Sequence, residues 1–332
     1  MKRTVVLVLL SPESGDAAAY RQAVEGDPEL RERVTLRFAT GDAVREAITD
    51  AEVVTCGNVS AEQVAAARNL RWISFWSAGM DGKARPELLT RGLLLTSASG
   101  VHGPNIAEHV LAFMLMFTRR MPFYQRAQMA GRWEHFGSSR AGGGAEELTG
   151  KTLGIVGLGR IGEALTARAK AFEMRVVATK RNPQARYNAA VVPNALYPPE
   201  ELPRLLAESD HVCIALPYTP ETHHLFDAGM LAYMQPTAYL YNIARGKIVD
   251  EAALIAALQE GRLAGAGLDV FEEEPLPAES PLWRMENVII TPHVAGITPH
   301  YFARAAALFA DNLKRYLHGL PLQNLYDPAR GY

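Results

Sequence analysis

The sequence predicts an α/β protein with two doubly wound parallel-sheet domains. Short apolar segments alternate with helical stretches in both halves of the chain, and such β-α alternation produces parallel strands. A stretch rich in turn-forming residues, SGVHGPN at 99–105, separates the two series. The 332 residues are enough for two domains that each bury a sizeable core.

The first series precedes this break. Its expected strands are Thr4–Leu10, Val34–Phe38, Val53–Cys56, Trp72–Phe75 and Leu93–Thr96, with helices between them at 17–26, 42–49 and 60–69. The helix expected at 106–121 is apolar on nearly every side, so it should be buried, either in a core or against a second subunit.

The second series begins at Lys151, after a Gly/Ser-rich loop at 137–150. Its expected strands are Thr152–Val156, Arg175–Thr179, His211–Leu216, Ala238–Ile243, Ala264–Val270 and Val288–Thr291. A helix at 250–261 has Asp250 as its expected N-cap and Gly261 past its end. A last amphipathic helix at 303–319 can return to pack on the first domain.

Composition excludes several classes of function. The formal net charge is −2 and the pI about 6.5, so no global field favours nucleic acid or an anionic membrane. The longest apolar run is too short to span a bilayer, and the N-terminal apolar stretch fits a first strand better than a signal peptide. We therefore expect a cytoplasmic protein. Two cysteines rule out a disulfide framework, and the sequence has no HExxH, so no metal is expected.

A glycine motif opens the second series. Gly157, Gly159 and Gly162 have G-x-G-x-x-G spacing, directly after the strand Thr152–Val156 and before an amphipathic helix. The glycines allow a tight turn and close approach of the backbone to a pyrophosphate, while the helix N-terminus supplies donors. The combination predicts a Rossmann dinucleotide-binding domain.

The end of the next strand indicates which dinucleotide binds. An acidic residue is expected there when the ribose 2′-hydroxyl of NAD is recognised. This strand instead runs through Thr179 into Lys180, Arg181 and Asn182. The two cations would attract a 2′-phosphate. NADP(H) is therefore favoured, with NAD(H) possible.

Three charged residues follow strands of this domain. Arg245, Asp269 and His293 each stand at or just after the carboxyl end of an expected strand. Ligands of open α/β sheets bind at that edge. The three side chains therefore form a candidate converging site.

The motifs together resemble the NAD(P)-dependent D-2-hydroxyacid dehydrogenases. The resemblance covers nearly the whole chain and is carried, in family order, by SAGMDG, GLGRIG, LPYTPETHHL, NIARGKIVDEAAL, AGAGLDVFEEEP, NVIITPHVAG and NLKRYLHGLPLQN. With Lys180 in place of the acidic residue of NAD-dependent members, the chain looks most like the NADP-preferring glyoxylate/hydroxypyruvate reductases.

The resemblance implies roles for individual residues. Arg245 would hold the substrate's carboxylate and carbonyl oxygen, His293 would be the general acid/base, Glu274 would pair with it, and Asp269 would contact the nicotinamide end. The remaining implied contacts are Gly159, Arg160, Ile161 and Gly162 to the pyrophosphate, Pro217, Thr222 and Ile243 in the cofactor cleft, and the backbone of Ala78 and Gly79 to the substrate carboxylate.

Family architecture also implies a discontinuous substrate-binding domain. It would be flavodoxin-like and comprise residues 1–102 and 297–332, with a dinucleotide-binding domain at 103–296 and the active site in the cleft between them. A homodimer is expected, and the apolar helix 106–117 suits its interface. His102 and His109 flank the expected hinge and should be structural.

The stretch FEEEP at 271–275 raises a separate question, because a run of like charges is usually a solvated loop. We expect that interpretation to hold for Glu272 and Glu273, and Glu274 to be the residue paired with His293. A nearby carboxylate favours the imidazolium form, which holds a proton for the alkoxide that develops when a 2-keto acid is reduced.

The sequence is also consistent with two other functions. A glycine follows Asp81 where many members have asparagine, and Phe75 and Trp76 are bulky, so the substrate side chain is undetermined. A reductase of a bulkier, phenylpyruvate-like 2-keto acid is the first alternative. A non-catalytic protein that senses dinucleotides is the second.

Overall fold

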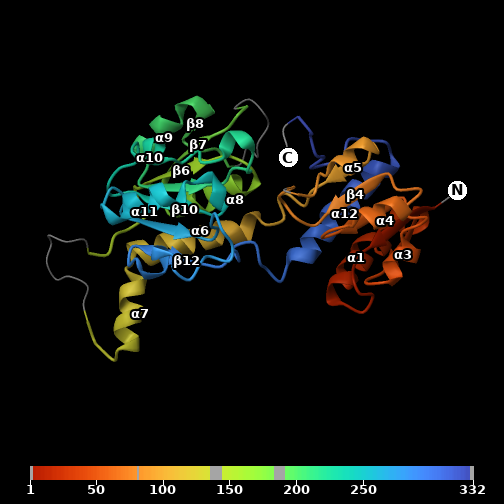
Figure 1. The fold of residues 1–332 in the computed structure, drawn as a ribbon, viewed down its shortest axis with the longest axis horizontal. Coiled ribbons are helices and arrows are strands. Elements are labelled where there is room, and N and C mark those ends of the chain that lie inside the picture. The colour runs from red at the N-terminus through yellow and green to blue at the C-terminus, as the bar shows by residue number, and fades with distance from the viewer. Residues whose placement is uncertain (1–2, 81, 135–143, 183–190, 330–332) are drawn as a thin grey trace. The chain divides into compact units, whose positions relative to one another are not determined.

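The computed structural model describes residues 3–80, 82–134, 144–182 and 191–329. The chain divides into two compact units (Figure 1). Unit 1 comprises Met1–His102 and Thr298–Tyr332, and unit 2 comprises Gly103–Ile297. Within the described residues, no helix is long and apolar enough to cross a membrane.

Unit 1 is built on a parallel sheet. Its described residues form five strands in the order β2-β1-β3-β4-β5. The strands are β1 (Thr4–Val8), β2 (Val34–Phe38), β3 (Val53–Cys56), β4 (Trp72–Phe75) and β5 (Leu94–Thr96). The helices are α1 (Gly15–Glu25), α2 (Pro28–Arg33), α3 (Ala43–Ala47), α4 (Ala61–Ala66), α5 (Pro86–Thr90) and α12 (Tyr301–Leu317).

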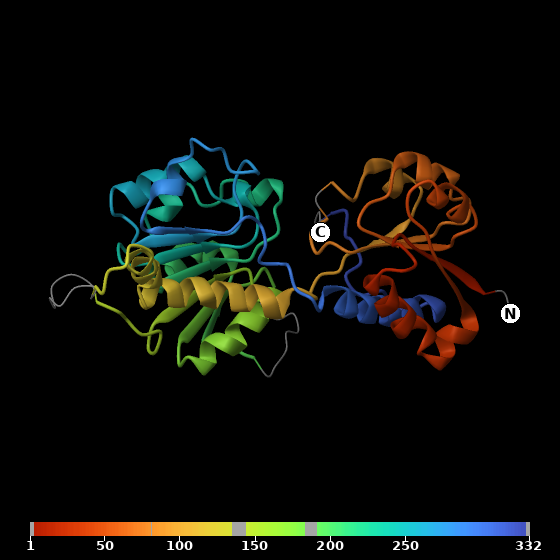
Figure 2. The same cartoon turned by 90° about the horizontal axis from the view of Figure 1, so that it is seen from below.

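Helices cover both faces of this sheet (Figure 2). α1 and α12 pack together in one core, where the rings of Trp72 and Phe309 stack with centroids 5.3 Å apart. The other core contains α3, α4 and α5. β3 and β4 are buried at every position, as expected for strands covered on both sides. The last helix therefore packs on the unit formed by the start of the chain.

Unit 2 contains a second parallel sheet. Its described residues form seven strands in the order β12-β11-β10-β9-β6-β7-β8. The strands are β6 (Thr152–Val156), β7 (Arg175–Thr179), β8 (Ala195–Tyr197), β9 (His211–Ile214), β10 (Tyr239–Asn242), β11 (Gly265–Leu268) and β12 (Val288–Ile290).

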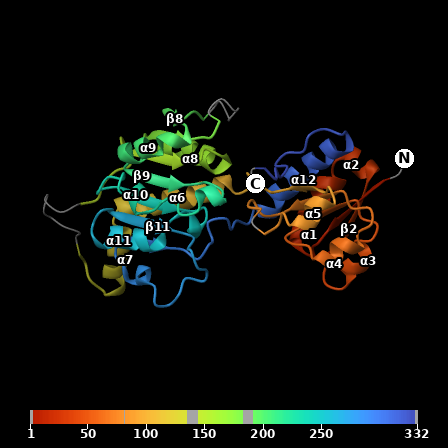
Figure 3. The same ribbon diagram turned by 45° about the horizontal axis from the view of Figure 1, so that its top comes forward.

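Its helices are α6 (Gly103–Thr118), α7 (Met121–Met129), α8 (Arg160–Ala171), α9 (Leu202–Glu208), α10 (Ala228–Leu231) and α11 (Glu251–Gln259), with 3-10 turns η1 (Pro199–Glu201), η2 (Pro220–Thr222), η3 (Gly246–Ile248) and η4 (Pro281–Arg284). α6 and α8 cover one face, and α9, α10 and α11 cover the other; Figure 3 labels all five helices. The strand order reverses between β6 and β9, which is the switch point where doubly wound sheets bind ligands.

Most expected elements form within three residues of their predicted ends. The predicted N-cap is confirmed, since the Asp250 side chain accepts a hydrogen bond from the Ala253 amide. Several elements were not predicted, among them α2, α5, α7 and β8. β8 is three residues long and is defined by its pairing with β7, and α7 buries a single side chain, that of Ala127. The predicted Gly/Ser loop lies partly outside the described residues, as does Asp81.

The apolar helix α6 and the two cysteines were predicted to be buried, and they are. The apolar side chains of α6 are buried within unit 2, against α8 and the sheet, so its apolar character does not require a second subunit. Cys56 and Cys213 are both buried in strands, as predicted, and burial raises the pKa of each thiol to about 12.

Candidate active site

The glycine loop lies between β6 and α8, beside the switch point. Gly157 has φ +101°, and a Cβ there would lie 2.8 Å from the Leu216 side chain. A Cβ on Gly162 would come within 3.1 Å of the Gly157 carbonyl oxygen. A Cβ on Gly159 would meet no described atom within 4 Å, so this side of the loop is open. The first-turn amides of a helix lack intrahelical acceptors, and here they adjoin the open side. The loop therefore fits a pyrophosphate.

The residue at the end of β7 holds this loop in place. The Gly157 amide donates to Thr179 Oγ1 at 3.0 Å, and the Leu158 amide donates to the Thr179 carbonyl at 2.8 Å. The Lys180 amide then donates to the Tyr197 carbonyl at 2.9 Å. The unpredicted strand β8 thus positions the basic pair, in which Lys180 is half-buried and Arg181 exposed.

Arg245 follows β10 in a turn stabilised by Asn242. The Asn242 side chain donates to the Arg245 carbonyl at 3.0 Å and accepts from the Ala244 amide at 3.1 Å. Gly246 packs directly on the backbone of Phe271, because a Cβ there would lie 1.8 Å from its carbonyl carbon. The turn that carries Arg245 is therefore in contact with the FEEEP segment.

Glu274 and His293 are joined by a short hydrogen bond. Nδ1 of His293 lies 2.7 Å from Oε2 of Glu274, and the Phe271 amide donates to Oε1 at 3.1 Å. An ionised carboxylate only accepts, so Nδ1 carries the proton and Nε2 is left for a reactant. The His293 side chain is 49% exposed, so this nitrogen can be reached.

The prediction for Glu272 was wrong. We expected it to be part of a solvated charge run, but Oε1 lies 2.8 Å from Nε2 of His224 and accepts from the Glu251 amide at 3.1 Å. The Glu272 amide in turn donates to the Glu251 carboxylate at 3.2 Å. Glu272 therefore ties the segment to the start of α11. Glu273 is exposed.

Asp269 follows β11 and is almost fully buried, at 1% exposure. Its carboxylate accepts hydrogen bonds from the Thr291 hydroxyl and from the backbone of the turn that contains His293. Thr291, and the two α6 residues Asn105 and His109 that bond to the same turn, were not predicted as site residues. Their hydrogen bonds depend on packing between distant segments, which spacing in the sequence does not reveal.

The residues predicted to line the cofactor cleft lie in unit 2, and those predicted to contact the substrate through their backbone lie in unit 1. The Thr222 hydroxyl donates to the Pro217 carbonyl at 2.9 Å, and Ile243 is 6% exposed in the unit 2 core. Ala78 and Gly79 belong to unit 1, in the turn after β4. Upstream of them, Phe75 is buried in the core of unit 1.

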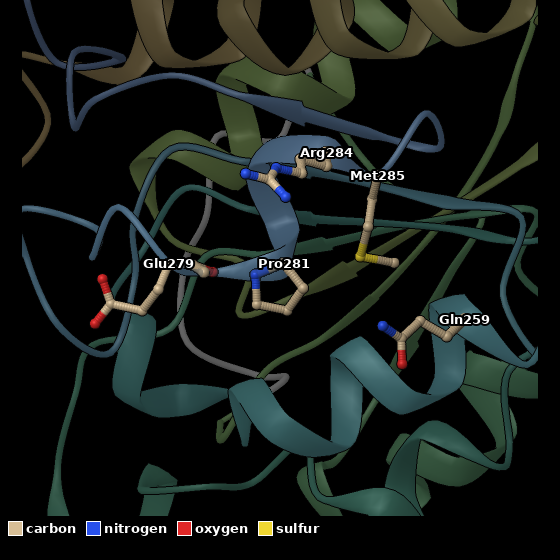
Figure 4. A pocket seen from close by; sticks show the side chains of 6 residues that line it. Gln259, Glu279, Pro281, Arg284 and Met285 are labelled. Atoms are coloured by element: carbon tan, nitrogen blue, oxygen red, sulfur yellow. The ribbon is translucent and has the colours of Figure 1, made fainter.

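Among the described residues, no group of three His, Cys, Asp or Glu side chains could hold a metal ion. A surface pocket of about 480 Å³ lies between α11 and the segment 279–285 (Figure 4). Its lining residues, Gln259, Glu279, Ser280, Pro281, Arg284 and Met285, include none of the predicted site residues.

The fold and the site define a class of protein. A glycine loop at the switch point of a parallel sheet, with an arginine and an acid-paired histidine after two other strands of the same sheet, is typical of dinucleotide-dependent α/β oxidoreductases. Residues 111–295 match the family model described as D-isomer specific 2-hydroxyacid dehydrogenase, NAD binding domain. The chain belongs to the D-isomer specific 2-hydroxyacid dehydrogenase family and is an oxidoreductase.

Named relatives cover most of the chain. It is 39% identical over 293 residues to a glyoxylate reductase from Thermofilum pendens, covering 88% of this chain and 83% of the relative. It is 38% identical over 278 residues to a glyoxylate/hydroxypyruvate reductase B from Yersinia pestis, covering 82% of each. The crystal structure of a D-isomer specific 2-hydroxyacid dehydrogenase from Xanthobacter autotrophicus, in complex with NADPH and MES, aligns with a TM-score of 0.78 and 32% identity, over 98% of this chain and 100% of that one.

Proposed function

We propose that the protein is an NADPH-preferring reductase that converts a small 2-keto acid, of the glyoxylate or hydroxypyruvate class, to the D-2-hydroxy acid. The observation that carries the proposal is the 2.7 Å hydrogen bond between Glu274 and His293, in a domain with an open glycine loop. Relatives named glyoxylate reductase and glyoxylate/hydroxypyruvate reductase support the substrate class.

Three side chains have separate roles in the reduction. When bound, the reduced nicotinamide supplies a hydride for the keto carbon. His293 supplies a proton from Nε2 to the developing alkoxide, while the Glu274 carboxylate stabilises the protonated ring. Arg245 binds the substrate carboxylate and stabilises negative charge on the reacting oxygen. Unit 1 acts as the substrate-binding domain, through the backbone of Ala78 and Gly79.

Cofactor contacts follow from the loop and its neighbours. Gly159, Arg160, Ile161 and Gly162 hold the pyrophosphate; Pro217, Thr222, Ile243 and Asp269 line the remainder of the cofactor site. Lys180 and Arg181 take the 2′-phosphate, since the chain has no carboxylate at 179–182 to repel it. The Xanthobacter relative forms a complex with NADPH, which agrees with this preference.

Steady-state kinetics with NADPH and NADH against glyoxylate, hydroxypyruvate and phenylpyruvate test the proposal. We expect the highest kcat/KM with NADPH and one of the two small acids. A preference for phenylpyruvate would overturn the substrate class. Tight NADPH binding without turnover of any acid would indicate the non-catalytic sensor instead.

The cofactor preference has a test of its own. Lys180→Ala and Arg181→Ala should each raise the KM for NADPH by about tenfold, and that for NADH by much less, because only NADPH carries the 2′-phosphate. Lys170→Ala is the matched control, since Lys170 is an exposed lysine in the last turn of α8, away from the glycine loop. Equal effects on both cofactors would contradict the assignment.

We also propose that the protein is a homodimer and acts in the cytoplasm. Large apolar side chains are exposed on and after α7, including Met121, Met129 and Trp133, at 51%, 84% and 93%. Figure 1 shows α7 projecting from the layers of unit 2. Light scattering coupled to gel filtration would measure the mass, and a monomer at micromolar concentration would contradict the dimer.

A further inference from the structure

The turn that presents His293 has an unfavourable backbone conformation. His293 has φ +53°, in the left-handed region that residues with a Cβ rarely adopt. Its amide donates to the Asp269 carbonyl at 2.8 Å. Such a conformation persists only where its surroundings stabilise it. The contacts of the turn therefore determine where the imidazole lies.

The buried carboxylate of Asp269 is the centre of these contacts. Oδ1 accepts from the Thr291 hydroxyl at 2.6 Å and from the Val294 amide at 2.9 Å. Oδ2 accepts from the Ala295 amide at 2.9 Å. A buried anion needs such donors to offset its lost hydration. All three donors lie on residues that flank His293, so the carboxylate and the turn hold each other in place.

α6 also bonds to this turn. The Asn105 side chain donates to the Ala295 carbonyl at 2.7 Å, and Nε2 of His109 lies 3.0 Å from Thr291 Oγ1. Asn105 and His109 are four residues apart, so they share one face of the helix. The helix therefore contacts both ends of the turn.

The direction of the hydrogen bonds follows from the Thr291 hydroxyl. It has one proton, which it donates to Asp269, so it must accept from His109, and Nε2 of His109 must carry hydrogen. Burial lowers the pKa of His109, against an opposing effect of Asp269, so the ring is neutral near pH 7. At 3.8 Å the carboxylate is too far from Nε2 for a direct hydrogen bond.

We propose that Thr291 and His109 are positioning residues for His293. The chain of hydrogen bonds from His109 through Thr291 to Asp269 holds the turn so that Nε2 of His293 meets the reacting oxygen. This inference rests on the proposed function, because it assigns His293 the proton transfer. A displacement of about 1 Å at a reacting group can lower the rate roughly 100-fold, so loss of one link should slow turnover.

Thr291→Val is the main test, because valine keeps the shape of threonine and removes the hydroxyl. We expect kcat for reduction of the preferred 2-keto acid to fall about 10- to 100-fold. The Kd for NADPH, measured by fluorescence titration, should change by less than about threefold, because the glycine loop is untouched. Thr291→Ser restores the hydroxyl and should recover most of kcat.

A second pair of variants tests His109 and keeps the proposal falsifiable if Thr291→Val does not fold. His109→Leu removes the donor, whereas the amide nitrogen of His109→Gln can take the place of Nε2. We expect kcat to fall in the leucine variant and to be largely retained in the glutamine variant.

Nuclear magnetic resonance of the ligand-free protein gives a readout independent of turnover. In protein labelled with ¹⁵N-histidine at pH 7, the resonances absent from His109→Gln should show a protonated Nε2 and an unprotonated Nδ1. The same Nε2–H resonance should shift in Thr291→Val.

The outcomes separate the two proposals. An unchanged kcat in Thr291→Val, a loss that serine does not restore, or a His109 ring protonated on Nδ1 would overturn the positioning role. If the wild-type protein reduces no 2-keto acid, the proposed function fails, and the histidine spectra still decide whether the chain of hydrogen bonds exists.

Discussion

The three adjacent glutamates of FEEEP have three different environments. Glu274 is hydrogen-bonded to His293, Glu272 links His224 to the start of α11, and Glu273 is exposed. Three adjacent glutamates have the same local propensity, so the sequence around them does not distinguish their environments. What distinguishes them is which distant segment each side chain meets.

Glu274→Gln should slow reduction about 10- to 100-fold at neutral pH and move the decline of the rate to lower pH. The amide occupies the same space but lacks the charge that stabilises the protonated imidazole. The measurement is the pH–rate profile of kcat/KM for the preferred 2-keto acid. Glu273→Gln is the matched control, because Glu272 has structural contacts. A profile that Glu274→Gln leaves unchanged would remove Glu274 from the site.

His211 gives a prediction about stability rather than activity. It is 2% exposed, its Nδ1 lies 2.9 Å from the Tyr241 hydroxyl, and burial lowers its pKa to about 4. The His211 imidazole therefore binds a proton more tightly in the unfolded chain than in the folded protein. The neutral His211 therefore contributes fully to the free energy of unfolding above about pH 6.5. This contribution, about 3 kcal/mol, is lost as the pH falls through 4.

Urea unfolding of the wild type and His211→Asn between pH 7 and 4 measures this effect. Asparagine does not titrate and can still bond to Tyr241, so its free energy of unfolding should depend less on pH. Equal pH dependence in both proteins would mean that His211 is not the group responsible.

At the scale of elements, the strand β6, the glycine loop and α8 form the part of the site that was predicted most completely. Strand, loop and helix are contiguous in the chain, and their pattern is local. β8 was missed, although it fixes the backbone of Lys180, because a three-residue edge strand is defined by its partner and not by its own periodicity.

Two glycine substitutions should separate folding from cofactor binding. Gly157→Ala should cost about 1–3 kcal/mol of stability, because φ is positive and the new Cβ would press on Leu216 and the Ala215 carbonyl. Gly159→Ala should leave the Tm nearly unchanged, because its surroundings are open and its φ is −105°.

The same Gly159→Ala should weaken NADPH binding about tenfold or more, because its methyl group takes the place of the pyrophosphate. Thermal unfolding and a fluorescence titration measure the two effects. A Gly159→Ala protein that binds NADPH normally would contradict the proposed phosphate site.

At the scale of the whole molecule, each unit has its own cores. The clusters that contain α6, α8 and α11 lie within 103–297, and those that contain α1 and α12 combine the two ends of the chain. The proposed contacts to the cofactor all lie in unit 2. We therefore expect NADPH binding to stabilise unit 2 more than unit 1.

Hydrogen exchange measured by mass spectrometry, with and without NADPH, tests this expectation. Peptides that cover 157–163 should become more protected, because ligand binding stabilises the state that binds it. Peptides that cover β1 and β3, in the separate core of unit 1, should keep their exchange rates. Protection confined to unit 1 would contradict the placement of the cofactor.

The sequence alone determined the alternation of strands and helices, the glycine loop, the basic pair after β7 and the positions of Arg245 and His293 after two strands of the sheet. These depend on local periodicity, on backbone freedom at glycine and on the rule that ligands meet the carboxyl ends of strands. Only the tertiary structure decided that Glu272 accepts a hydrogen bond from the first amide of α11, that β8 supports Lys180, and that Asp269 and His109 bond to Thr291 in the turn of His293. Those contacts join segments up to 182 residues apart, and a hydrogen bond depends on the distance in space between two atoms, which the spacing of residues along the chain does not specify.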